Sequence, residues 1–247
     1  MAYDLKQSPS DTFTQYVEGD QKLFSASTGL QNSDLVKLER VFRYTPQIAS
    51  FLADLDATFP AIDIPGEWDA YAGKAELADG QSPEITVYKD DVTLFQTVFK
   101  EAQRVARSID GGGRRVAVLC ASEEQFDRYA AISLGQFPGT HFLIGSREPS
   151  SELQHAGKRF IFSMPEYVAG LQFDTVFLVH ADVAEAPANA GDGLRRRFIS
   201  NIYLGSSRAE KMLRLSSSMA RGGRSDIFDM AIARESLQEV APSKTGK

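Results

Sequence analysis

The part of the sequence best suited to bind an anion is one basic run, Arg195, Arg196 and Arg197. Clustered arginine side chains bind phosphate groups because binding releases counterions from the polyanion. Further basic residues follow along the chain: Arg208, Lys211, Arg214, Arg221 and Arg224. The net charge of −6 argues against a uniformly basic surface, so the run predicts a local patch. A solvated helix face explains the same residues equally well.

Signatures of independent catalysis are absent from the sequence. No GxxxxGK(S/T) phosphate-binding loop occurs, because the Gly-Lys pairs at 73–74 and 157–158 lack the glycine spacing and the following hydroxyl residue. The GGGRR segment at 111–115 lies between a predicted helix and strand, whereas phosphate loops run from strand to helix, so we expect it to end the helix. No GxSxG turn occurs either. Three histidines have neither metal-ligand spacing nor a cysteine partner: His141, His155 and His180.

The composition is that of an ordinary globular protein, with 43% hydrophobic and 24% charged residues in a chain of 247. That length is sufficient for one large or two small domains. No apolar run approaches the roughly 20 residues of a membrane span, and the first residues lack the pattern of a signal peptide. We therefore expect a soluble, cytoplasmic protein. The single cysteine, Cys120, lies in an apolar run and is expected in the core.

Apolar runs separated by helical patterns predict an α/β fold. The expected strands lie at 84–88, 114–121, 141–146, 158–164, 173–181 and 212–218. Two amphipathic helices are expected among them, over 91–109 and about 123–134. Strands with little alternation are buried on both faces, so the pattern predicts a mainly parallel sheet flanked by helices. Ligands of such sheets usually lie beyond the carboxyl ends of the strands.

The ends of the chain have weaker patterns. Residues 1–33 are polar and predicted to be irregular, whereas residues 34–218 hold the periodic segments and form the predicted main domain. Helical spacing at its start predicts two short helices, at 35–42 and 48–55. Residues 219–247 are expected to form one amphipathic helix, about Ser225 to Leu237, followed by a loose tail.

Three separated stretches resemble, in order and content, the C-terminal motifs of UvrD/Rep-like superfamily 1 helicases. The first is LERVFRYTPQIASFL at 38–52, in which Phe42 and Arg43 match the family's aromatic residue and arginine. The resemblance implies that Phe42 stacks on adenine and that Arg43 reaches the terminal phosphate of ATP. An aromatic face stacks on any base, and a guanidinium grips phosphate through two hydrogen bonds.

The second stretch, FSMPEYVAGLQFDTVFLV at 162–179, is similar to the family's loop and strand that join the nucleotide site to the nucleic acid. The match places Gly170 and Gln172 at the nucleotide, with Gln172 replacing the glutamate that bonds the sugar. An amide can make the same hydrogen bond. Three residues depart from the family's threonine, histidine and lysine: Met164, Glu166 and Ala169. Glu166 would repel phosphate, which argues against a grip on nucleic acid by this loop.

The third stretch is RRRFISNIYLGSSRAEKMLRLSSS at 195–218. It resembles the family's arginine-rich helix followed by a strand, and Tyr203, Arg208 and Ala209 match. The resemblance implies that Arg208 is an arginine finger, which enters the nucleotide site between two RecA-like domains and stabilises charge on the transferred phosphoryl group.

Together the three stretches imply a RecA-like second motor domain that cannot hydrolyse ATP alone. ATP with Mg²⁺ would bind only at an interface with an N-terminal helicase motor domain, in the same longer chain or in a separate protein. Single-stranded DNA would be a partner, and Arg195, Arg196 and Arg197 are the candidate contacts. The alternative is a degenerate helicase-like domain that acts as a protein-interaction or regulatory module. An unrelated α/β enzyme is less favoured, because no coherent nucleophile, metal or cofactor pattern occurs.

Overall fold

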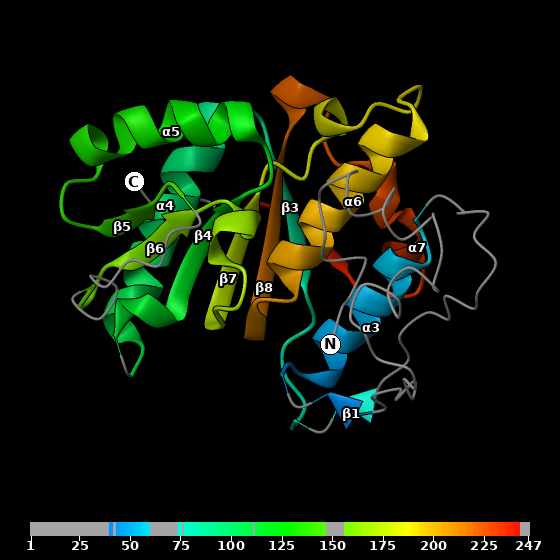
Figure 1. The fold of residues 1–247 in the computed structure, drawn as a ribbon, viewed down its shortest axis with the longest axis horizontal. Helices are drawn as coiled ribbons and strands as arrows, with labels where there is room; N and C mark the ends of the chain where they lie inside the picture. Colours follow the sequence, from blue (N-terminus) through cyan, green and yellow to red (C-terminus); the bar gives the residue numbers. More distant parts are fainter. Residues whose placement is uncertain are drawn as a thin grey trace, which may run out of the picture.

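The computed structural model describes residues 40–41, 43–59, 74–75, 77–110, 112–146 and 156–242. Its centre is a sheet of seven parallel strands in the order β5-β6-β4-β7-β8-β3-β9 (Figure 1). The strands are β3 (Glu84–Tyr88), β4 (Val116–Cys120), β5 (His141–Ile144), β6 (Phe160–Ser163), β7 (Phe173–Val179), β8 (Ala209–Ser218) and β9 (Gln238–Val240). The prediction of a mainly parallel α/β sheet is confirmed.

The central strands are apolar because helices cover both faces of the sheet. Every residue of β4, β6 and β7 is buried, as expected for strands that read as continuous apolar runs. Cys120 ends β4 and is buried and unpaired, so its predicted place in the core is confirmed. Alternate residues of each strand enter two separate hydrophobic clusters, one on each face.

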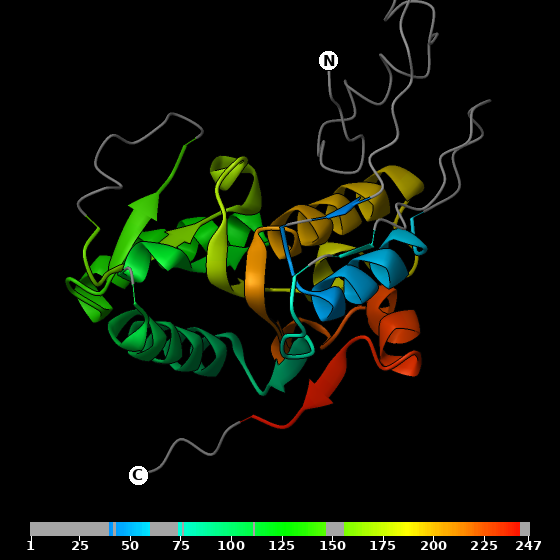
Figure 2. The same cartoon turned by 90° about the horizontal axis from the view of Figure 1, so that it is seen from below.

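Among the described residues, two helices cover one face of the sheet and three cover the other. The helices α4 (Asp91–Ser108) and α5 (Glu123–Gln136) bury their apolar sides in the first cluster, and Asp90 caps α4 by accepting from Thr93 N. The second cluster includes α3 (Pro46–Asp56), α6 (Asp192–Ser206) and α7 (Asp229–Ala233). Figure 2 shows α4 on the opposite side of the sheet from α3 and α6. In the described part of the chain, none of the helices has the length and apolarity needed to cross a membrane.

Two expectations about the ends of the chain differ from the structure. Residues Arg40–Val41 form the short strand β1, paired with β2 (Lys74–Ala75), instead of the end of a helix. The helix expected over Ser225 to Leu237 is reduced to a 3-10 turn, η7 (Asp226–Phe228), and the short α7. The chain then becomes extended, because the open edge of β3 supplies backbone partners for β9. The predicted irregular segment 1–33 lies outside the described residues.

Candidate functional site

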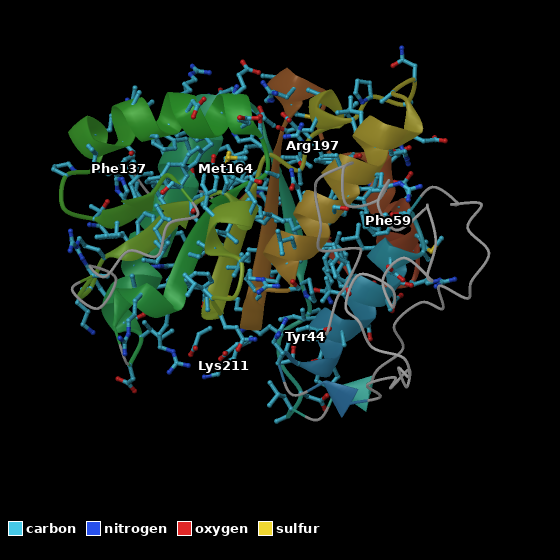
Figure 3. The ribbon with its side chains drawn as sticks, in the orientation of Figure 1. Tyr44, Phe59, Phe137, Met164, Arg197 and Lys211 are labelled. Atoms are coloured by element: carbon cyan, nitrogen blue, oxygen red, sulfur yellow. The ribbon has the colours of Figure 1, made fainter. Side chains whose placement is uncertain are left out.

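The three stretches predicted to face a nucleotide meet at the amino ends of the central strands. Thr45 N donates to Glu210 O at 3.2 Å, which ties the first stretch to β8. Phe173 N donates to Arg208 O at 2.9 Å, which ties the second stretch to the third. In Figure 3, Lys211 marks this edge at the bottom of the sheet. The candidate residues therefore lie at the amino edge of the sheet. The expectation was the other edge, because ligands of parallel sheets usually lie beyond the carboxyl ends of the strands.

The side chains of Arg43, Gln172 and Glu210 form a hydrogen-bonded chain at this edge. With its amide oriented so that both ends find partners, Gln172 accepts from Arg43 Nε at 2.8 Å and donates to Glu210 Oε1 at 3.3 Å. Arg43 and Gln172 are both exposed, and Gln172 directly precedes β7, beside the start of β8. A guanidinium, an amide and a carboxylate are thus held within reach of a ligand that approaches this edge.

Arg208 lies on the same edge, but its side chain is buried, with 3% exposed. Its Nε donates to Leu204 O at 3.2 Å, and its Nη2 donates to Ser207 Oγ at 3.1 Å. Leu204 belongs to the last turn of α6, so the guanidinium satisfies a terminal carbonyl and lies near the negative end of the helix dipole. In this conformation Arg208 stabilises the end of α6. Its predicted contact with phosphate requires the side chain to rotate outward.

Asp174, the second residue of β7, is held by two cations. Arg115 Nε donates to its Oδ1 at 2.6 Å, and Lys211 Nζ donates to its Oδ2 at 2.9 Å. The Asp174 side chain is 7% exposed, and two ionic partners offset the cost of removing this carboxylate from water. Arg115 Nη2 also lies 3.7 Å from Glu210 Oε2. These ion pairs join the starts of β4, β7 and β8.

Gly170 and Phe42 are the other residues expected at the nucleotide. Gly170 lies in the turn between η4 (Pro165–Val168) and β7, with a φ of 92° that favours glycine. A Cβ at this position would meet no other described atom within 4 Å. The conformation of the turn, rather than a close approach, therefore requires glycine here. Phe42 lies outside the described residues, so its stacking on a base stays a prediction.

The segment from Met164 to Gln172 runs from one edge of the sheet to the other. Met164 follows β6 at the carboxyl edge and is 3% exposed (Figure 3). The next residue, Pro165, packs against α6, where a Cβ on Gly205 would lie 3.2 Å from the proline ring. A buried thioether donates no hydrogen bond to a phosphate. At Met164 this loop is therefore packed against the protein, at the place where the family carries a hydroxyl.

The basic run Arg195, Arg196 and Arg197 lies in α6, near the carboxyl edge. Both terminal nitrogens of Arg195 donate to Asp226, each at 3.1 Å. Burial raises the pKa of Asp226, but the hydrogen bonds and charge of Arg195 outweigh this effect and the pKa is lowered. Arg197 Nη2 lies 3.8 Å from Glu123 Oε2, and both side chains are more than half exposed. The basic patch is therefore partly neutralised, and Figure 3 shows Arg197 far from the amino edge.

Sequence reasoning missed a buried polar network at the carboxyl edge. The ring of His180 is fully buried, with Nδ1 2.7 Å from Asp182 Oδ2 and Nε2 2.6 Å from Tyr129 Oη. Asp182 also accepts from Ser218 N at 2.6 Å and lies 3.3 Å from Arg221 Nε. Burial raises the pKa of Tyr129. The network joins α5 to the ends of β7 and β8, and its signal in the sequence is a histidine and an aspartate two residues apart after an apolar strand.

By sequence, the chain matches no protein-family model and no curated protein. Two solved structures resemble it. The C-terminal domain of a possible DNA helicase from Lactobacillus plantarum WCFS1 superposes with a TM-score of 0.51 and 16% identity, over 80% of this chain and 98% of that one. The UvsW helicase from bacteriophage T4 gives a TM-score of 0.35 and 12% identity, over 90% and 76%. The first likeness shows that this chain has an α/β, RecA-like fold like that of the first structure.

Proposed function

We propose that this chain is the second motor domain of a UvrD-like ATP-dependent DNA helicase. It would supply one wall of an ATP site, and an N-terminal motor domain would supply the phosphate-binding loop. The observation that carries the proposal is the meeting of Arg43, Gln172 and Arg208 at one edge, although they lie in three distant parts of the sequence. Mg²⁺ would be bound mainly by the other domain.

The proposed roles follow from the position of each side chain. Arg43 uses Nε to bond Gln172, so its two terminal nitrogens are the ones offered to the terminal phosphate of ATP. Gln172 would contact the sugar through the remaining hydrogen-bonding capacity of its amide. Arg208 would leave the end of α6 and stabilise charge on the transferred phosphoryl group. Phe42 would stack on the base.

The test of this proposal is ATP hydrolysis by the chain combined with a first motor domain that carries a phosphate-binding loop. We expect single-stranded DNA to stimulate hydrolysis, and Arg208→Ala to lower turnover on the order of 10³-fold, as loss of an arginine finger does. Arg107→Ala is the matched control, because Arg107 is exposed near the end of α4, on the opposite face of the sheet from α6.

The same experiment must separate catalysis from folding, since Arg208 also stabilises the end of α6. Arg208→Lys keeps a positive charge and a donor near the Leu204 carbonyl, but it loses the planar guanidinium that binds phosphate through two bonds. A large loss of turnover in both variants supports the arginine-finger role of Arg208, provided that Arg208→Lys has the melting temperature of the unmodified chain. Unchanged turnover in both variants would show that Arg208 has no role in ATP hydrolysis.

A second candidate function is that of a protein-interaction or regulatory module related to helicases. Its support is the loop at the carboxyl edge, where Met164 is buried and Glu166 stands in place of the family's histidine. Under this alternative the chain would bind a partner protein with the same affinity in the presence or absence of ATP and single-stranded DNA. Calorimetric titration with and without both ligands distinguishes the two functions.

A further inference from the structure

Glu210 contacts each of the segments that form the proposed nucleotide wall. Its backbone oxygen accepts from Thr45 N at 3.2 Å, two residues after Arg43. Its Oε1 accepts from the Gln172 amide at 3.3 Å, and its Oε2 lies 3.7 Å from Arg115 Nη2. The side chain is 28% exposed, so it lies at the rim of the edge rather than in the core. Glu210 also lies only two residues after Arg208.

The contact between Glu210 and Gln172 explains why an amide occupies position 172. A glutamate there would place a second carboxylate oxygen about 3.3 Å from Glu210 Oε1, where like charges repel each other. An amide avoids the repulsion, because its nitrogen donates to Glu210 while its oxygen accepts from Arg43. The residues at 172 and 210 therefore form a matched donor and acceptor pair.

We propose that Glu210 is a positioning residue of the nucleotide site, which fixes the orientation of the Gln172 amide and, through it, the guanidinium of Arg43. This inference rests on the proposed function. Without Glu210 the amide is free to rotate, so its oxygen no longer faces Arg43 in one orientation. Arg43 is exposed and would then lose the contact that orders its side chain. Glu210 would thus act on substrate binding without contacting the substrate.

Other charges face Glu210 and must be kept constant in any test. Arg115 precedes β4 and approaches the Glu210 carboxylate directly. Asp174 on β7 is held by Arg115 and by Lys211, the residue after Glu210. A swap of the two side chains at 172 and 210 keeps the total charge of this group, whereas a single substitution changes it by one unit.

The first experiment uses the chain alone and compares Gln172→Glu, Glu210→Gln and the double swap Q172E/E210Q. In Gln172→Glu, repulsion raises the folded pKa of one carboxyl above its unfolded value, so the variant is penalised above that pKa and recovers as the pH falls. We expect its melting temperature to lie about 3 °C below that of the unmodified chain at pH 7.5, with most of the difference lost by about pH 4, below the unfolded pKa of a glutamate. The double swap should restore the melting temperature at both pH values.

The second experiment measures ATP hydrolysis by the chain combined with the first motor domain. We expect Glu210→Ala to raise the KM for ATP about tenfold with kcat changed less than about threefold, because a hydrogen bond that orders a binding residue is lost. An unchanged KM, or a loss confined to kcat, overturns the positioning role. The double swap should restore the KM, and Arg107→Ala should leave both constants unchanged.

The two proposals fail in different ways. If the unmodified chain supports no hydrolysis with a first motor domain, the proposed function and the positioning role both fall, whatever the stability of the swap. If hydrolysis is normal and depends on Arg208 but not on Glu210, only the positioning role is overturned. If the double swap fails to restore the melting temperature at pH 7.5, the inference that the side chains at 172 and 210 form a donor and acceptor pair is wrong.

Discussion

Arg208 illustrates how one side chain can be both a structural and a proposed catalytic group. Among its contacts in the structure, it donates to the Leu204 carbonyl and to the Ser207 hydroxyl, which are uncharged acceptors. A phosphate offers the guanidinium an opposite charge and two oxygens in bidentate geometry, which a carbonyl or a hydroxyl does not. A phosphate that reaches the edge would therefore compete with these two acceptors for the guanidinium. Without a ligand, the hydrogen bonds at the end of α6 provide acceptors for the buried guanidinium of Arg208.

His141 gives a pH-dependent prediction at the scale of one residue. It is 4% exposed, its Nε2 lies 3.0 Å from Ser133 Oγ, and burial together with the charge of Arg159 lowers its pKa to about 4. The folded protein therefore disfavours protonation, and stability is lost as the pH falls from the unfolded pKa of 6.5 towards 4. Between pH 7.5 and pH 5 we expect His141 to cost about 2 kcal/mol of unfolding free energy.

The matched variant for this prediction is His141→Gln, which keeps polar partners for Ser133 but does not titrate. Urea unfolding of both proteins at the two pH values gives the loss of unfolding free energy on acidification. Both proteins have the same carboxylates, so a difference between the two losses comes from His141. The stability of the variant should fall less on acidification than that of the unmodified chain. Equal losses would show that His141 is protonated in the fold at little cost.

At the scale of elements, the segment after β8 is an integral part of the fold. Phe228 of η7 is fully buried, and its ring stacks against Phe51 of α3 with the centroids 6.4 Å apart. We expect Phe228→Ala to lower the unfolding free energy by about 3–5 kcal/mol, because it removes a buried ring and leaves a cavity. Met219→Ala is the control, since Met219 is 61% exposed and its truncation should change stability by less than about 0.5 kcal/mol. Urea unfolding compares them, and equal stability would mean that the segment only rests on the surface.

The sequence predicts elements whose conformation depends on their own residues. Continuous apolar runs identify β4 and β7, because strands buried on both faces have that composition in any mainly parallel sheet. The strands β1 and β9 have only two and three residues, and their extended form depends on partners distant in sequence. One example is Gln238 N, which donates to Pro83 O at 2.9 Å. No local pattern records such a contact, so these strands were not predicted.

The same difference between local patterns and contacts of distant segments applies to the candidate site. Arg43, Gln172 and Arg208 were found through a family resemblance, and the structure brings the segments around them to one edge. Glu210 was not found, because a glutamate at the start of a strand is unremarkable until three segments are placed around it. The sequence alone indicates no role for His180, since its partners Asp182 and Tyr129 become apparent only when α5 is packed against the end of β7.

At the scale of the whole molecule, the two edges of the sheet have different chemistry. The amino edge presents Arg43, which is exposed and donates to the uncharged amide of Gln172, and Lys211, which is 65% exposed but paired with Asp174. At the carboxyl edge, Asp182 and Glu185 pair with Arg221, and Asp226 pairs with Arg195. An anionic nucleotide is therefore better matched to the amino edge. A nucleic acid at the carboxyl edge must compete with these carboxylates for Arg195 and Arg221.

This competition predicts that the basic run contributes unequally to the binding of single-stranded DNA. The pair between Arg197 and Glu123 is long, at 3.8 Å, and exposed on both sides, so a phosphate exchanges with it at little cost. Arg195 donates two bonds to Asp226 and must give up both. We expect Arg197→Ala to reduce the dependence of log K on log salt by about 0.7, the value for one phosphate contact on a single strand. Arg195→Ala should leave that slope nearly unchanged.

Fluorescence anisotropy of a labelled oligo-dT, titrated with this chain at several salt concentrations, measures both slopes. Arg107→Ala on α4 controls for the change in net charge, because the long-range effect of one charge is largely screened beyond a Debye length of about 8 Å at physiological salt. Equal reductions for Arg195→Ala and Arg197→Ala would mean that phosphate displaces Asp226 from Arg195. No reduction for either would place the binding of nucleic acid away from Arg195 and Arg197 of α6.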